Sequence, residues 1–200
     1  MRVLLVSANR EHIPDPIFPL GLAYIAAATQ QAGHEIAVAD LCFGRRPVTD
    51  LQQQIQTFRP AVIGLSIRNI DNAAYPLTID YLAEHRAVVE AIRAVTDATV
   101  VLGGSGFSIL PGAYLLALQA DYGITGAAEQ TFTALLAALE NRQDPASIPG
   151  VIPQHATSGC GLSITHPAGD SFLWEDGLHP ARHAFDYVRY IRRGGSGNIQ

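Results

Sequence analysis

Short apolar runs alternate with longer amphipathic stretches over roughly the first 140 residues of the chain. The short runs are rich in β-branched residues and are apolar on both faces, which is typical of strands covered by helices on each side. The longer stretches carry apolar residues at helical spacing, and proline or glycine marks several of their ends. We therefore predict strands at residues 2–7, 34–40, 61–66, 99–102 and 121–126, separated by helices at 19–32, 50–58, 75–95, 111–119 and 129–140.

This alternation predicts a parallel sheet with helices on both faces, because each crossover connection is short and right-handed. We expect an α/β fold with a doubly wound five-stranded parallel sheet of the Rossmann or flavodoxin type, in strand order 2-1-3-4-5. In this order a ligand binds outside the carboxyl ends of the strands, at the switch point between the first and third strands. The loops after the first, third, fourth and fifth strands would then open into one crevice.

A glycine-rich loop follows the fourth predicted strand and contains Gly103, Gly104 and Gly106. Glycines at the carboxyl end of a buried strand remove the Cβ atoms that would keep a ligand off the backbone, and they expose N–H groups to phosphate or amide oxygens. A turn that needs glycine only for its conformation is the alternative. On the pattern alone, the residues expected to share the crevice are Asn9, Ser66, Arg68, Gly103–Phe107 and Gly126–Glu129.

The composition changes after the predicted α/β domain of residues 1–145. From Pro149 onward, proline, glycine and histidine interrupt short polar runs, which favours one or two hairpins followed by a linker over residues 146–200. The final segment, Arg192–Gln200, is rich in glycine. Such an end either frays or leads into a further strand.

Charge and cysteine content narrow the class of protein. The net charge is −5 and all thirteen basic residues are arginine, so a nucleic-acid binder with a basic face is disfavoured. No apolar run approaches the roughly 18 residues of a membrane span, and the N-terminus lacks the signal-peptide pattern. Cys42 and Cys160 are far apart in the sequence and suggest neither a disulfide framework nor a metal site. We therefore expect free thiols, a cytoplasmic location and no membrane partner.

Several common chemistries find little support in the sequence. His179 and His183 have helical spacing, but Pro180 lies between them and the metalloprotease glutamate is missing. Ser105 stands in Gly-Gly-Ser-Gly rather than in a nucleophile elbow. The first strand lacks a following glycine fingerprint and no Walker A sequence occurs, which disfavours dinucleotides and nucleoside triphosphates. We predict no catalytic residue and no metal ligand in this chain.

Five segments carry a further signal in their order and spacing: residues 19–26, 33–40, 62–66, 101–106 and 123–130. Together they resemble the N-terminal cobalamin-binding domain of B12-dependent radical SAM enzymes, over about residues 1–145. The resemblance implies that the corrin ring rests on the loops after the first and third strands and that the benzimidazole tail enters a slot between the sheet and a helix. The cofactor-binding residues that it implies are Asn9, Pro19, Leu20, Gly21, Ser66, Ile67, Arg68, Asn69, Gly103, Gly104, Ser105, Gly106, Phe107, Gly126, Ala127 and Glu129.

The resemblance extends to the end of the chain. Arg192–Gln200 is similar to the segment that precedes a radical SAM barrel, whose C-x3-C-x2-C iron–sulfur motif this sequence lacks. It implies a longer parent chain in which a barrel holds a 4Fe–4S cluster and S-adenosylmethionine. That parent would transfer a methyl group to an unknown substrate or perform another radical reaction, whereas this chain alone would not be catalytic.

The sequence lacks the string that supplies a histidine to the lower face of the cobalt in other B12-binding proteins. Mutases and methionine synthase carry Asp-x-His-x-x-Gly, and the string from Asp40 to Gly44 differs from it in having Cys42 and in following the second strand. The resemblance thus implies cobalamin bound without its benzimidazole and without a histidine on the cobalt. Arg68 is expected below the ring, the alternative being a surface ion pair with Asp71 or Asp15.

For the whole chain, the alternative function is that of a flavodoxin-like binding or signalling domain without a corrin. Phospho-acceptor domains share this strand order, but they need an acidic cluster after the first strand. Ser7–Asn9 supplies none.

Overall fold

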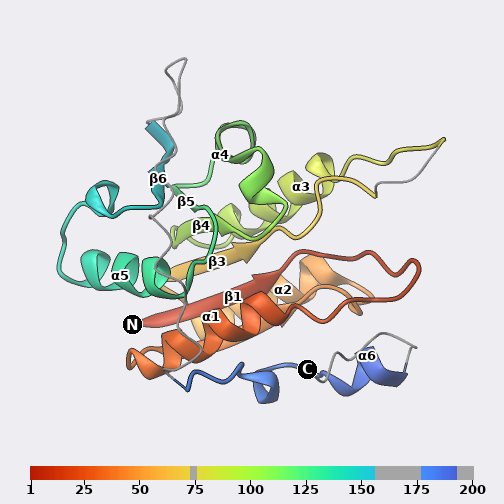
Figure 1. Cartoon of the computed structure of the whole chain (residues 1–200), viewed down its shortest axis with the longest axis horizontal. Coiled ribbons are helices and arrows are strands. Elements are labelled where there is room, and N and C mark those ends of the chain that lie inside the picture. Colours follow the sequence, from red (N-terminus) through yellow and green to blue (C-terminus); the bar gives the residue numbers. More distant parts are fainter. Residues whose placement is uncertain (73–75, 156–176, 193–200) are drawn as a thin grey trace.

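The computed structural model describes residues 1–72, 76–155 and 177–192. Its centre is a six-stranded sheet in the order β2-β1-β3-β4-β5-β6 (Figure 1). The first five strands are parallel, which confirms the predicted order 2-1-3-4-5. The strands are β1 (Arg2–Ser7), β2 (Glu35–Asp40), β3 (Val62–Ser66), β4 (Thr99–Gly103), β5 (Tyr122–Ile124) and β6 (Val151–Pro153).

Helices cover both faces of this sheet, as the doubly wound fold requires (Figure 1). One face packs against α1 (Leu20–Gln31) and α5 (Glu129–Glu140). The other packs against α2 (Pro47–Phe58), α3 (Leu82–Arg93) and α4 (Pro111–Leu118). Shorter helical segments are η1 (Phe107–Ile109), η2 (Pro145–Ser147), η5 (Arg182–Ala184) and α6 (Val188–Arg192). Within the described ranges, no helix combines the length and apolarity needed to span a bilayer.

Successive residues of the central strands belong to two different cores. In β1, Leu4 and Val6 join the core under α2, α3 and α4, whereas Val3 and Leu5 join the core under α1 and α5. All four side chains are fully buried. A strand covered on both faces has no solvent side, which explains why its sequence is continuously apolar rather than alternating.

The sheet has one more strand than predicted. Residues of β6 pair antiparallel with β5, so that Ile152 lies opposite Gly123. Val151 and Ile152 are both buried, each in a different core, and their burial stabilises this edge of the sheet. The rest of the predicted hairpin region, residues 156–176, lies outside the described residues.

The predicted helix at 75–95 begins later, at Leu82. The segment before it forms an isolated antiparallel bridge between Asp71 and Asp80. The carboxylate of Asp80 accepts a hydrogen bond from the backbone N–H of Leu82 at 2.6 Å, which stabilises the helix start there. Leu77 fits the apolar spacing but is 72% exposed, because it lies in the extended segment and not on the helix.

Candidate functional site

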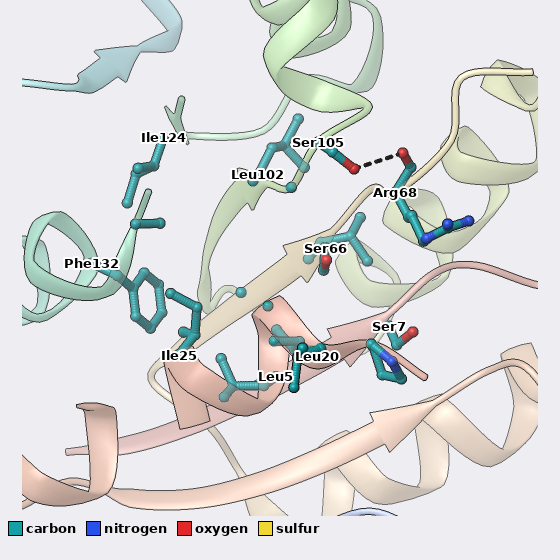
Figure 2. A pocket seen from close by; sticks show the side chains of 18 of the residues that line it. Leu5, Ser7, Leu20, Ile25, Ser66, Arg68, Leu102, Ser105, Ile124 and Phe132 are labelled. Atoms are coloured by element: carbon teal, nitrogen blue, oxygen red, sulfur yellow. Dashed lines mark hydrogen bonds between the residues drawn. The ribbon is translucent and has the colours of Figure 1, made fainter. Parts of the chain in front are cut away.

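A cavity of about 680 Å³ lies between the sheet and the helices α1 and α5 (Figure 2). This volume is within the range of about 300–1,000 Å³ that is usual for ligand pockets. Its floor includes Leu5, Gly64 and Val101, which the strand register places in one row across β1, β3 and β4. Ile25 of α1 and Phe132 of α5 approach this floor from the helices (Figure 2). The deep part of the cavity is therefore apolar.

The next row of the sheet, at its carboxyl edge, consists of Ser7, Ser66 and Gly103. The side chains of both serines line the cavity, and within the described residues neither hydroxyl makes a hydrogen bond. A Cβ built on Gly103 would have no neighbour closer than the carbonyl oxygen of Ile124, at 3.7 Å. This row therefore offers two hydroxyls and a bare backbone to a ligand.

The rim of the cavity is linked by hydrogen bonds between the loops after β1 and β3. Arg68 Nη1 donates to Asn69 Oδ1 at 3.1 Å, and Asn69 Nδ2 lies 3.5 Å from Asn9 Oδ1. Ser105 Oγ donates to the carbonyl of Arg68 at 3.0 Å (Figure 2). Among the described residues Arg68 forms no ion pair, so the alternative pairing with Asp71 or Asp15 is absent from this arrangement.

The glycine loop after β4 is packed on the backbone that follows β3. Gly104 has a φ of +104°, and a Cβ there would lie only 2.5 Å from the carbonyl oxygen of Ile67. Gly106 is similarly close to the backbone of Arg68, and its N–H donates to the Ile67 carbonyl at 3.0 Å. Gly104 is therefore needed for both its conformation and the close approach of the two loops, and Gly106 for the close approach alone. In this loop, Gly103 is the glycine at which a Cβ would make only an ordinary contact, at 3.7 Å from the Ile124 carbonyl oxygen.

Most of the residues predicted for the site line this cavity. Ile67 and Phe107 do not, because they are fully buried in the core on the opposite face of the sheet. Gly106 packs on backbone instead, and Asn69 supports the rim without lining the cavity. The predicted residues that do line it are Asn9, Pro19, Leu20, Gly21, Ser66, Arg68, Gly103, Gly104, Ser105, Gly126, Ala127, Ala128 and Glu129.

Sequence reasoning missed the deeper part of the cavity. A strand that is buried on both faces does not reveal which residues face a given helix. One signal was available, since glycine inside a buried strand often marks a close approach, and Gly64 interrupts β3 in this way. The lining residues that were not predicted are Leu5, Ser7, Ile17, Phe18, Leu22, Ile25, Gly64, Leu65, Val101, Leu102, Ser108, Ile124 and Phe132.

Titratable side chains near the rim have structural roles. The carboxylate of Glu11 accepts hydrogen bonds from the hydroxyl of Tyr81 and from the backbone N–H groups of Ile13 and His12, and these bonds lower the pKa of Glu11. Glu11 thereby ties the loop after β1 to the segment before α3. Burial raises the pKa of the Cys42 thiol to about 11, so this thiol is protonated at neutral pH.

Among the described residues, histidine, cysteine, aspartate and glutamate form no cluster of three that suits a metal ion. None of the described residues that line the cavity is a histidine.

Comparison with known proteins assigns this arrangement to a family. The sequence model of the B12 binding domain family matches residues 6–136 of this chain. The tryptophan 2-C-methyltransferase of Streptomyces laurentii is 32% identical over 156 residues, which is 75% of this chain and 25% of that protein. The chain thus spans about a quarter of the length of this relative.

Solved structures agree with this assignment. The radical S-adenosylmethionine methyltransferase TsrM from Kitasatospora setae, solved with cobalamin and a 4Fe–4S cluster, is 35% identical with a TM-score of 0.71, over 76% of this chain and 27% of that chain. The cobalamin-dependent S-adenosylmethionine radical enzyme OxsB, solved with aqua-cobalamin, aligns with a TM-score of 0.62. The alignment covers 75% of this chain and 20% of the OxsB chain. At 15% identity, OxsB supports the fold alone. A family match over more than half of the chain shows that the protein belongs to the B12 binding domain family.

Proposed function

We propose that this domain binds cobalamin, with the benzimidazole tail in the cavity under α1 and α5 and the corrin ring at the rim. The observation that carries this proposal is the edge row of Ser7, Ser66 and Gly103 above an apolar floor. An aromatic tail matches the apolar depth of the cavity, since burying apolar surface is favourable. The two hydroxyls and the open backbone at Gly103 would bind the polar groups that join the tail to the ring.

The proposed cofactor-binding residues are those predicted ones that line the cavity, together with its floor. Pro19, Leu20 and Gly21 begin α1 beside the opening, and Gly126, Ala127 and Glu129 lead into α5 on the other side. Gly21 and Gly126 leave open space where a side chain would stand. A bulky ring system therefore meets little steric resistance at this mouth.

Arg68 is proposed to lie below the ring at the cobalt. A guanidinium is always protonated and donates hydrogen bonds only, so it does not bind a metal. The positive charge of Arg68 would disfavour binding of a further ligand to the cobalt on this side of the ring, and it would also disfavour the higher oxidation states of the cobalt. Among the described residues that line the cavity there is no histidine, and Arg68 is the basic side chain at its rim. We therefore propose that cobalamin binds with its benzimidazole tail removed from the cobalt and without a histidine in its place.

When bound, cobalamin supplies a cobalt centre that can accept and pass on a methyl group. This chain's residues would hold the tail, orient the ring and place a positive charge at its lower face. By analogy with the relatives, we propose a longer parent enzyme whose radical SAM barrel holds S-adenosylmethionine and a 4Fe–4S cluster. We propose residues 1–145 as the cofactor domain and 146–200 as the connection toward that barrel, while the substrate belongs to the barrel.

Reconstitution tests the proposal directly. The chain is incubated with hydroxocobalamin, desalted, and examined by visible absorption, with flavin mononucleotide as a parallel probe. We expect corrin absorbance at about one cobalamin per chain and no retained flavin. A desalted chain without corrin absorbance would overturn the proposal and favour a flavodoxin-like domain without a corrin.

A further inference from the structure

Residues 177–192, which we call the strap, return to the α1 side of the molecule (Figure 1). The backbone N–H of Ala181 donates to the carbonyl of Ala23 in α1 at 2.9 Å. Phe185 and Tyr190 are buried, at 6% and 1% exposure. Side chains this well buried hold the strap against the domain, although it lies more than 100 residues after α1 in the sequence.

The aromatic side chains of the strap converge on Phe18. The ring of Phe18 lies 5.3 Å from that of Phe185 and 5.5 Å from that of Tyr190, both in edge-to-face geometry. The Arg182 guanidinium lies over the same ring at 5.3 Å. Phe18 also lines the cavity, so one side chain is shared by the strap and the proposed cofactor site.

A second set of contacts fixes the far end of the strap at the loop after β2. The hydroxyl of Tyr190 donates to Asp40 Oδ2 at 2.6 Å, and its ring lies 4.8 Å from that of Phe43. Arg189 donates to the carbonyl of Phe43 at 3.3 Å and lies over its ring. The strap is therefore held at α1 and at β2, on either side of Phe18.

The loop between β1 and α1 is attached mainly in its first part, where His12 Nε2 lies 2.7 Å from the carbonyl oxygen of Cys42. Glu11 holds its first part, whereas Ile13 is 81% exposed and Ile17 is 36% exposed. Pro16 and Phe18 are the buried residues of the second part of this loop, and Phe18, at 6% exposure, is the one of the two that lines the cavity. The position of this cavity wall therefore depends on the rings that pack against Phe18.

We propose that the strap is a positioning element of the cavity: by clamping Phe18 it sets the wall against which the cofactor tail packs. This inference rests on the proposed function. Because binding free energies are reciprocal, a ligand that packs on Phe18 must stabilise the docked strap as much as the docked strap stabilises the ligand. Strap docking and cofactor retention are thus one coupled equilibrium.

The test compares release of hydroxocobalamin from the full chain and its variants. Tyr190→Leu and Phe185→Leu remove rings from Phe18, whereas Tyr190→Phe keeps the ring and loses the hydrogen bond to Asp40. Arg93→Met is the control, because it breaks the 2.7 Å ion pair with Asp121 without touching the strap. We expect about tenfold faster release from the two leucine variants, a smaller change for Tyr190→Phe, and wild-type release from the control.

Amide hydrogen exchange gives a readout that needs no cofactor. In the free chain, the leucine variants should speed exchange over residues 11–18, and the control should not. In the wild type, hydroxocobalamin should slow exchange of the Ala181 amide. Wild-type release in both leucine variants would overturn the strap's role and leave cobalamin binding intact. A wild type that retains no corrin would instead overturn the proposed function, and the coupling with it.

Discussion

Phe132 of α5 packs against Gly64 in the middle of β3, so closely that a Cβ on Gly64 would lie 3.2 Å from the Cζ atom of Phe132. The same Cβ would lie 3.1 Å from Cδ2 of Leu5. The absence of one side chain thus lets α5 approach the sheet and gives the cavity its apolar depth. Any group added here must displace Leu5 or Phe132 toward the space proposed for the cofactor tail.

Gly64→Ala should therefore weaken hydroxocobalamin binding by about tenfold while the fold persists. The crowding is offset by the lower entropy of the unfolded alanine chain, so unfolding free energy should change by less than about 2 kcal/mol. Absorbance titration and urea unfolding measure the two quantities. Ile63→Val, on the opposite face of β3, is the control and should cost about 0.5–1.5 kcal/mol without changing affinity. Wild-type affinity in Gly64→Ala would show that the tail does not reach this depth.

The neighbouring glycines Gly103 and Gly104 should respond differently to valine. Gly103→Val adds a side chain at the cavity, where its Cβ would make only an ordinary contact with the Ile124 carbonyl at 3.7 Å, so it should keep the fold and abolish retention of hydroxocobalamin on desalting. Gly104→Val adds a Cβ at positive φ against the Ile67 carbonyl and should cost about 1–3 kcal/mol or more. Thermal unfolding by circular dichroism and the absorbance after desalting separate the two effects. A Gly103→Val chain that still retains cobalamin would place the ligand elsewhere.

Arg68→His tests the proposed position below the ring. An imidazole at this place can bind cobalt, so the visible spectrum of the reconstituted variant should shift relative to wild type. Arg68→Gln is the matched control, because it removes the charge without supplying a strong metal ligand. A histidine variant that binds cobalamin with a wild-type spectrum would count against Arg68 at the cobalt.

His85 of α3, which is buried on the face of the sheet opposite the cavity, should make the stability of the fold depend on pH. Burial lowers the pKa of His85 from 6.5 to about 4, and among the described residues its Nδ1 atom has no hydrogen-bond partner. Between these two values the unfolded chain binds a proton that the folded chain does not. Stability should therefore fall as the pH falls from 6.5 to 4, by up to about 3 kcal/mol from this group.

The variant His85→Leu should remove that part of the pH dependence. We expect its unfolding free energy, measured by urea at pH 7 and pH 4.5, to differ less between the two conditions than that of the wild type. At pH 7 the variant should be about as stable as wild type, since no hydrogen bond to the described residues is lost. If the unfolding free energy of both chains changed equally between pH 7 and pH 4.5, the pKa of His85 would not be lowered by folding.

Local pattern alone determined the alternation of strands and helices and the bounds of α5. The strand order was inferred from the doubly wound fold class, and the structure confirms it, together with the edge of the sheet where Asn9, Ser66 and Gly103 meet. Periodicity and the positions of proline and glycine are properties of neighbouring residues, so they can be read without a structure. The resemblance to cobalamin-binding domains depended on the same segments. The family match over residues 6–136 confirms it.

Only the tertiary structure decided which face of the sheet contains the cavity and which glycine of the loop after β4 could carry a side chain without a steric clash. Gly103 and Gly104 are adjacent and both line the cavity, yet only a Cβ on Gly104 would meet the Ile67 carbonyl, because Gly104 follows the end of β4 and has a φ of +104°. The ring contacts of Phe18 with Phe185 and Tyr190 could not be predicted either, because these two residues follow Phe18 by more than 160 positions in the sequence. Contacts between distant segments depend on how the chain packs, and no local pattern of side chains encodes them.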